Sequence, residues 1–233
     1  MLTLDYIFPT PIWSAELDID VREMQKICYE IAKSRPSKSR SNRGIKNYQS
    51  PDFSAEQIIQ DGGESDEFAK ALIQIRMLAN EAFDTFQSFA TTLRFANTWI
   101  NISSKGGYNE VHTHPGAVLS GVLYVKVPCE GDAGALCFHR NSMDSFTIQS
   151  LGLLGATARA KTPHAISNET YMPKEGKVIL FPAWVGHGVR ENSTDDDRIS
   201  ISFNLIPKRD MAAIIKARGE DSQRKPEIYE RAK

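Results

Sequence analysis

The second half of the chain limits the possible folds most, because it is a series of short apolar runs without long helical stretches. After residue 90, six β-like runs follow one another, separated at intervals of roughly ten residues by Gly, Pro, Asn and Asp. This spacing is typical of an antiparallel sandwich or barrel, and it argues against alternating strands and helices. The runs are 92–104, 117–128, 134–141, 145–150, 177–189 and 198–207.

The first half of the chain favours helices. Segment 21–33 places apolar residues at helical spacing after Asp18 or Asp20, either of which can cap a helix. Segment 65–90 carries a longer apolar stripe that begins after Ser65. Two helices followed by about eight strands indicate a mainly β, α+β fold whose helices pack on the outside of the sheets.

We expect one domain over residues 1–233. Residues 1–90 supply a short strand and the supporting helices, and residues 91–207 form the β core. The tail 208–233 is charged and prone to form a helix.

Composition and charge exclude several classes of protein. The chain is 41% hydrophobic and 24% charged, and its formal net charge of −1 disfavours nucleic acid as a partner. No apolar run approaches the roughly 20 residues that span a bilayer, and the N-terminus lacks the features of a secretory leader. Three cysteines without a paired spacing suit a reducing compartment, so we expect a cytoplasmic protein. The basic stretch 33–46 is typical of a solvated loop, with an entrance lid or a phosphate contact as the alternative.

Two histidines one residue apart, His112 and His114, are candidates for metal binding. On an extended chain they point to the same face, and Pro115 favours that geometry at His114. A third candidate, His187, follows a strand that we expect to be buried, between two glycines that permit close backbone approach. The spacing alone is a weak signal, because paired histidines on a strand are more often solvated or hydrogen-bonded than bound to metal.

The run 198–207 alternates polar and apolar residues, and Arg198, Ser200 and Ser202 share its polar face. That face either contacts solvent or lines the interior of a barrel, where Arg198 can bind a carboxylate with two parallel hydrogen bonds. The turn-forming segment NSTDDD precedes Arg198. If this segment closes a hairpin, Arg198 and His187 lie on neighbouring strands, roughly 13 Å apart along the backbone.

These motifs together resemble a known family. The segments "HTHPGAVLSGVLYVKVP" and "FPAWVGHGVRENSTDDDRISISFN" are similar to the 2-oxoglutarate- and Fe(II)-dependent oxygenases, and closest to a small bacterial and phage branch of them. Prolyl hydroxylases are more distantly similar. The likeness runs from Asn97 to Pro207 and implies a double-stranded β-helix, the jelly-roll barrel, with iron at its open end.

The resemblance implies roles for six residues and two cofactors, Fe(II) and 2-oxoglutarate. His112 and His187 match the family's first and last metal ligands, and His114 stands where the family normally has a carboxylate. Arg198 falls where the family binds the distal carboxylate of 2-oxoglutarate. Tyr124 and Ser200 are the other two residues that the resemblance implies contact 2-oxoglutarate.

The implied reaction is oxidative decarboxylation of 2-oxoglutarate coupled to hydroxylation of a substrate C–H bond. The substrate is a small molecule or a side chain that the sequence does not identify. The sequence does not determine the oligomeric state, and a homodimer is one candidate, because jelly-roll enzymes often pair through a sheet edge or terminal helices.

Two other functions remain open at the level of the sequence. Three histidines favour a cupin-like iron dioxygenase that does not use 2-oxoglutarate, although Arg198 argues against it. A non-catalytic jelly-roll binding module is the other. Around the site, core packing is the default expectation for Trp99 and Trp184. Asn101 and Asn109 are candidates to orient a ligand, with loop capping as an equal alternative.

Overall fold

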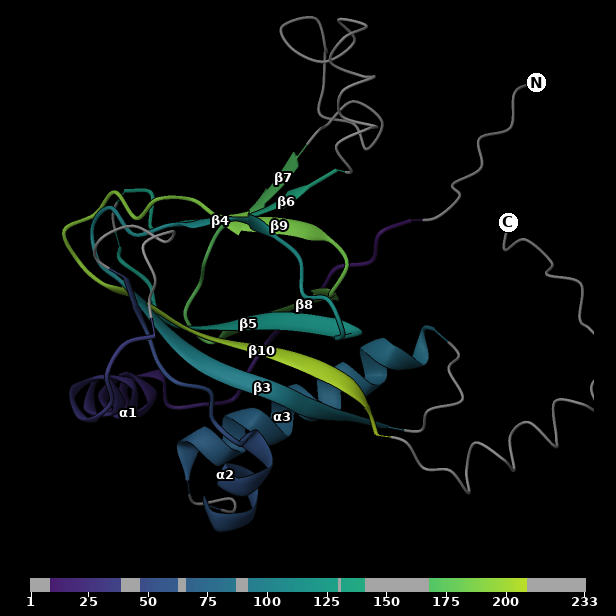
Figure 1. Ribbon diagram of the computed structural model, residues 1–233. Helices are drawn as coiled ribbons and strands as arrows, with labels where there is room; N and C mark the ends of the chain where they lie inside the picture. The colour runs from purple at the N-terminus through teal and green to yellow at the C-terminus, as the bar shows by residue number, and fades with distance from the viewer. Residues whose placement is uncertain are drawn as a thin grey trace, which may run out of the picture.

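The structure is a computed structural model that describes residues 9–38, 47–62, 66–86, 92–129, 131–140 and 168–208. Two antiparallel sheets face each other, and three helices cover the outer side of the larger sheet (Figure 1). The predicted mainly β fold with helices outside the sheets is confirmed at this level. The predicted run 145–150, most of the basic stretch 33–46 and the tail beyond Lys208 lie outside the described residues.

The larger sheet has six strands and the smaller sheet has four, and every pair of neighbouring strands is antiparallel. In spatial order the larger sheet contains β1 (Trp13–Glu16), β8 (Lys177–Pro182), β5 (Leu119–Lys126), β10 (Arg198–Lys208), β3 (Thr92–Ser103) and β2 (Asn47–Gln49). The smaller sheet contains β4 (Asn109–His112), β9 (Gly186–Val189), β6 (Leu136–His139) and β7 (Asn168–Tyr171).

Three helices bury their apolar faces on the larger sheet. They are α1 (Val21–Ser34), α2 (Ala55–Gly62) and α3 (Glu67–Asp84). Of the two residues that the sequence offered as caps of α1, Asp20 is the one used. Its Oδ1 accepts hydrogen bonds from the backbone N–H groups of the first turn. The sequence did not predict the short helix α2. Among the described residues, no helix has both the length and the apolarity that crossing a membrane requires.

The central strand β10 has two buried faces of different character. Its Ile201 and Phe203 side chains are fully buried in the core between the sheet and the helices. Its Arg198, Ser200 and Ser202 side chains point the other way and line a pocket between the two sheets. The polar face of this strand therefore lies in the interior and not in solvent.

The predicted hairpin that joined His187 to Arg198 is wrong. His187 lies on β9 in the smaller sheet, and Arg198 begins β10 in the larger sheet. The connecting segment crosses between the sheets and is held there by Asn192, whose Nδ2 donates to the carbonyl oxygens of Ser103 and Asp196, each at 2.8 Å. Because these bonds tie the turn to the end of β3, it cannot close a two-strand hairpin.

We expect the two faces of β10 to respond differently to truncation. Ile201→Ala leaves a cavity in the core and should lower the free energy of unfolding by about 2–5 kcal/mol. The neighbouring Ser200→Ala removes one hydroxyl from the pocket side and should change it by less than about 1 kcal/mol. Urea unfolding of both variants measures the difference, and equal destabilisation would contradict this assignment of the faces.

Candidate metal centre

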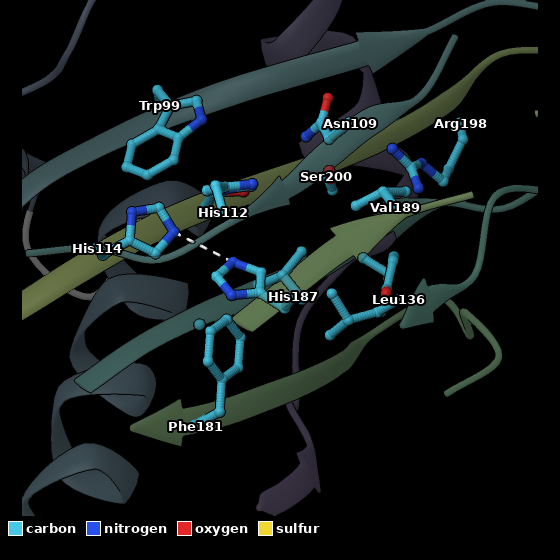
Figure 2. A pocket seen from close by; sticks show the side chains of 14 residues that line it. Trp99, Asn109, His112, His114, Leu136, Phe181, His187, Val189, Arg198 and Ser200 are labelled. Carbon is cyan, nitrogen blue, oxygen red and sulfur yellow. Dashed lines mark hydrogen bonds between the residues drawn. The ribbon is translucent and has the colours of Figure 1, made fainter. Parts of the chain in front are cut away.

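Three histidines from two distant parts of the sequence meet at one end of the smaller sheet (Figure 2). His112 on β4 lies directly opposite His187 on β9, and their ring centroids are 4.5 Å apart. His114 follows β4, and its ring centroid lies 5.0 Å from each of the other two. One ligand nitrogen from each ring lies within 4.8 Å of the others. The structure thus brings together the three histidines that the sequence predicted.

Two of these rings are oriented by the same local hydrogen bond. The Nδ1–H of His112 donates to the carbonyl oxygen of Glu110 at 2.7 Å, and that of His187 donates to Val185 at 2.9 Å. A proton on Nδ1 leaves the lone pair on Nε2, the usual ligand form of a histidine whose other nitrogen is fixed by a carbonyl. The Nε2 atoms of His187 and His114 are 3.2 Å apart, so each is within reach of one shared cation.

Burial keeps His187 neutral. The side chain is 4% exposed, and desolvation lowers the pKa of His187 to about 3, although its bond to the Val185 carbonyl acts in the opposite direction. The neighbouring histidines also disfavour a positive charge there. Because metals bind the neutral imidazole, His187 is ready to act as a ligand throughout the neutral pH range.

A bulge in β4 places both Asn109 and His112 on the pocket side. Asn109 pairs with Val189 and His112 pairs with His187, so β4 has one more residue than β9 between these two pairs. Gly188 permits the close contact that results, since a Cβ there would lie 3.0 Å from the Asn109 carbonyl oxygen. Asn109 lines the pocket, which is consistent with its predicted role as an orienting residue.

Arg198 is a buried cation at the other end of the same pocket. It is 2% exposed, its Nη1 donates to the Gly134 carbonyl at 2.6 Å, and its Nη2 donates to the Ser103 hydroxyl at 3.1 Å. Its buried Nε has no hydrogen-bond partner, and no acidic side chain among the described residues forms an ion pair with it. A buried cation is costly without an anion, so this site is suited to an anionic ligand.

The predicted cosubstrate residues Tyr124 and Ser200 lie in the same pocket as Arg198. Burial raises the pKa of Tyr124 to about 12, so its phenol keeps its proton and remains a hydrogen-bond donor at neutral pH. The pocket is lined by Trp99, Asn109, His112, His114, Gly121, Val122, Tyr124, Leu136, Phe181, His187, Val189, Arg198, Ser200 and Ser202.

The two tryptophans differ from the expectation of core packing. Trp99 lines the pocket, with its ring centroid 6.0 Å from that of His114. Trp184 is 61% exposed, because it sits in the turn that joins β8 to β9. Sequence reasoning also missed Gly134 and Ser103 as the partners of Arg198, since neither residue lies near it in the sequence or carries a recognisable motif.

A known family matches the central part of the chain. Residues 97–204 match the sequence profile of a family described as "Putative 2OG-Fe(II) oxygenase". This segment belongs to the 2-oxoglutarate- and Fe(II)-dependent oxygenases. The oxygenase segment extends from β3 to β10 and contains all three histidines together with Arg198. The predicted enzyme class is therefore confirmed. A search of curated proteins gave no match to the chain.

Solved oxygenases share the fold. A Pseudomonas putida prolyl-4-hydroxylase aligns with a TM-score of 0.57 and 12% identity, over 85% of this chain and 93% of its own. HygX from Streptomyces hygroscopicus, solved with nickel and 2-oxoglutarate bound, aligns with a TM-score of 0.52 and 13% identity, over 85% of this chain and 84% of its own. At these identities the likeness establishes the fold and not the substrate.

Metal binding should depend on His112 and His187. Because removal of a ligand costs more than the 10- to 100-fold typical of residues behind the ligands, we expect His112→Ala and His187→Ala each to weaken Co(II) binding by more than about 100-fold. His139→Ala is the matched control, since His139 lies beside Gly186 on the other face of the smaller sheet. Calorimetric titration measures the affinities. Binding as tight as the wild type in either ligand variant would refute the assignment.

Proposed function

We propose that the oxygenase binds Fe(II) through His112, His114 and His187 and holds the distal carboxylate of 2-oxoglutarate with Arg198. The observation that carries this proposal is one pocket with three convergent imidazoles at one end and a buried arginine without an acidic partner at the other. HygX supports it, as a similar fold solved with a divalent metal and 2-oxoglutarate. The two facing sheets are proposed to form a double-stranded β-helix.

The residues present fit a divalent iron. Imidazole nitrogens suit Fe(II), and three protein ligands leave the remaining positions for small molecules. All three ligands come from β4, β9 and the segment after β4, which together form one side of the pocket. The facing side of the pocket, from β3, β5 and β10, provides no acidic side chain among the described residues.

The residues at the other end of the pocket fit a dicarboxylate. The unpartnered Nε of Arg198 provides an N–H donor, and its guanidinium provides the balancing charge. Tyr124 and Ser200 add hydroxyl groups beside it. We infer that Arg198 binds the carboxylate, that Tyr124 donates a hydrogen bond to the cosubstrate and that Ser200 assists.

When bound, iron and 2-oxoglutarate supply the oxidising chemistry, in which dioxygen converts 2-oxoglutarate to succinate and carbon dioxide and hydroxylates a substrate C–H bond. The protein positions the reactants and keeps water away. Phe181 packs against His187 with ring centroids 4.5 Å apart, and Leu136 and Val189 are apolar residues that line the same pocket. Apolar side chains around a metal ligand limit the access of solvent and lower the local dielectric constant.

Two observations separate this proposal from the two alternatives. A three-histidine dioxygenase that binds its substrate directly has no use for a buried arginine at the far end of the pocket. A binding module without a metal has no use for three imidazoles directed at one point. The substrate is proposed to be a small molecule or a side chain. HygX, a protein of similar fold, has also been solved with nickel, 2-oxoglutarate and the small molecule hygromycin B bound. The cytoplasmic location and the homodimeric state remain predictions from the sequence.

Anaerobic titration with Fe(II) and then 2-oxoglutarate tests the proposal. A weak visible charge-transfer band should appear when 2-oxoglutarate chelates the iron. Arg198→Ala should weaken the binding of 2-oxoglutarate by about 30-fold or more, because the substitution removes one partner of a buried charge pair. Arg190→Ala is the control, since Arg190 is an exposed arginine that pairs with Asp132 at 3.3 Å. Circular dichroism verifies that both variants are folded.

The other outcomes point elsewhere. Iron binding without the band would favour the dioxygenase that does not use 2-oxoglutarate. No iron binding would favour a non-catalytic module. In aerobic assays, succinate release that requires both added Fe(II) and 2-oxoglutarate supports only the proposed function.

A further inference from the structure

The charge of the metal centre points to the class of its substrate, and this inference rests on the proposed function. The ligands are three neutral imidazoles, so a divalent ion keeps both of its positive charges. A carboxylate at the position of His114 would remove one of them. Among the fourteen pocket residues there is no Asp or Glu, and Arg198 is the single permanent cation.

With 2-oxoglutarate bound, the metal centre would keep one uncompensated positive charge. The cosubstrate brings two negative charges, of which one balances Arg198 and the other reaches the metal. Two positive charges on the metal minus one from the cosubstrate leave a net charge of about +1. A centre with a carboxylate ligand would be neutral at the same stage. The excess charge is therefore a property of this chain's own ligand set.

Among the described residues, the acidic residues on the strands of the smaller sheet do not cancel this charge. Glu110 is exposed on the β4 bulge and contributes only its backbone carbonyl to the site, as the acceptor for His112. Glu169 on β7 lies opposite Phe138, which in turn lies opposite His187, so it is two strands away, or roughly 10 Å at the usual strand spacing. Glu169 does not line the pocket.

Two neutral donors lie beside the histidines. Trp99 lies next to His114, and Figure 2 shows the Asn109 side chain in the same pocket, between His112 and Arg198. Among the described residues, none forms a hydrogen bond with the indole N–H of Trp99 or with the side-chain amide of Asn109. Both groups can donate to an oxyanion.

We propose that the primary substrate is an anion, whose carboxylate or phosphate group lies beside the metal and is bound by the excess charge together with the Trp99 and Asn109 donors. A neutral or cationic substrate would leave the positive charge uncompensated in a half-buried pocket. Carboxylate and phosphate share the relevant chemistry, and the experiment below separates them.

The test changes one charge at His114. Protein loaded anaerobically with Co(II) and 2-oxoglutarate is titrated with azide, and the cobalt absorption spectrum reports binding. His114→Asp and His114→Asn have the same shape and differ by one negative charge. We expect the Asn variant to bind azide about 100-fold more tightly than the Asp variant. This is the effect of one charge at roughly 6 Å and an effective dielectric constant of about 20. Equal affinities in the two variants would overturn the proposal.

A second comparison needs no variant, which keeps the proposal testable if either substitution prevents cobalt binding. In the wild-type complex, acetate should bind at least about tenfold more tightly than acetamide, and equal binding would overturn the proposal. Inorganic phosphate measured against acetate shows which oxyanion the pocket prefers. These experiments also distinguish failure of this inference from failure of the proposed function. If the proposed function is wrong, the cobalt spectrum does not respond to 2-oxoglutarate at all.

Discussion

The central strand β10 imposes the constraint on which the site depends, because both of its faces are buried. On one face, Ile201 and Phe203 pack between the sheet and the helices and provide stability through burial of apolar surface. On the other face, Arg198 and Ser200 are buried as well, although they are polar. A strand can hold polar side chains in this position only when partners satisfy them. Ser103 and Gly134 accept hydrogen bonds from the two terminal nitrogens of Arg198, and its buried Nε has no partner among the described residues.

The metal centre is assembled from short-range features on a long-range frame. Carbonyl groups two residues before His112 and His187 orient those rings, so each ring is oriented by its own local segment of chain. The pairing of β4 with β9 then brings the two rings together, and the bulge in β4 turns Asn109 to the same side. The centre therefore forms only when the smaller sheet forms, which links folding directly to metal binding.

The sequence predicted the parts of the site that depend on local rules. Alternation along 198–207 identified the polar face that lines the pocket, and the spacing of His112 and His114 identified two side chains on one face. The third histidine was found by its position after a strand that was expected to be buried. Alternation made Arg198 a candidate to bind a carboxylate, and the family resemblance implied the same role. The resemblance also gave the enzyme class, which the family profile confirms.

The rest depends on contacts between distant segments, which local patterns do not contain. The turn-rich segment before Arg198 reads as a hairpin, but hydrogen bonds from Asn192 tie it to β3 and carry the chain into the other sheet. Trp184 reads as a core residue, yet its turn leaves it exposed. No local signal could identify Gly134, whose carbonyl meets Arg198 across 64 positions of sequence.

An anaerobic crystal structure of the protein with Fe(II) and 2-oxoglutarate tests the central claim most directly. We expect iron bound by the Nε2 atoms of His112, His114 and His187, with the far carboxylate of 2-oxoglutarate on Arg198. Iron held by a carboxylate side chain in place of His114, or 2-oxoglutarate bound without contact to Arg198, would contradict it.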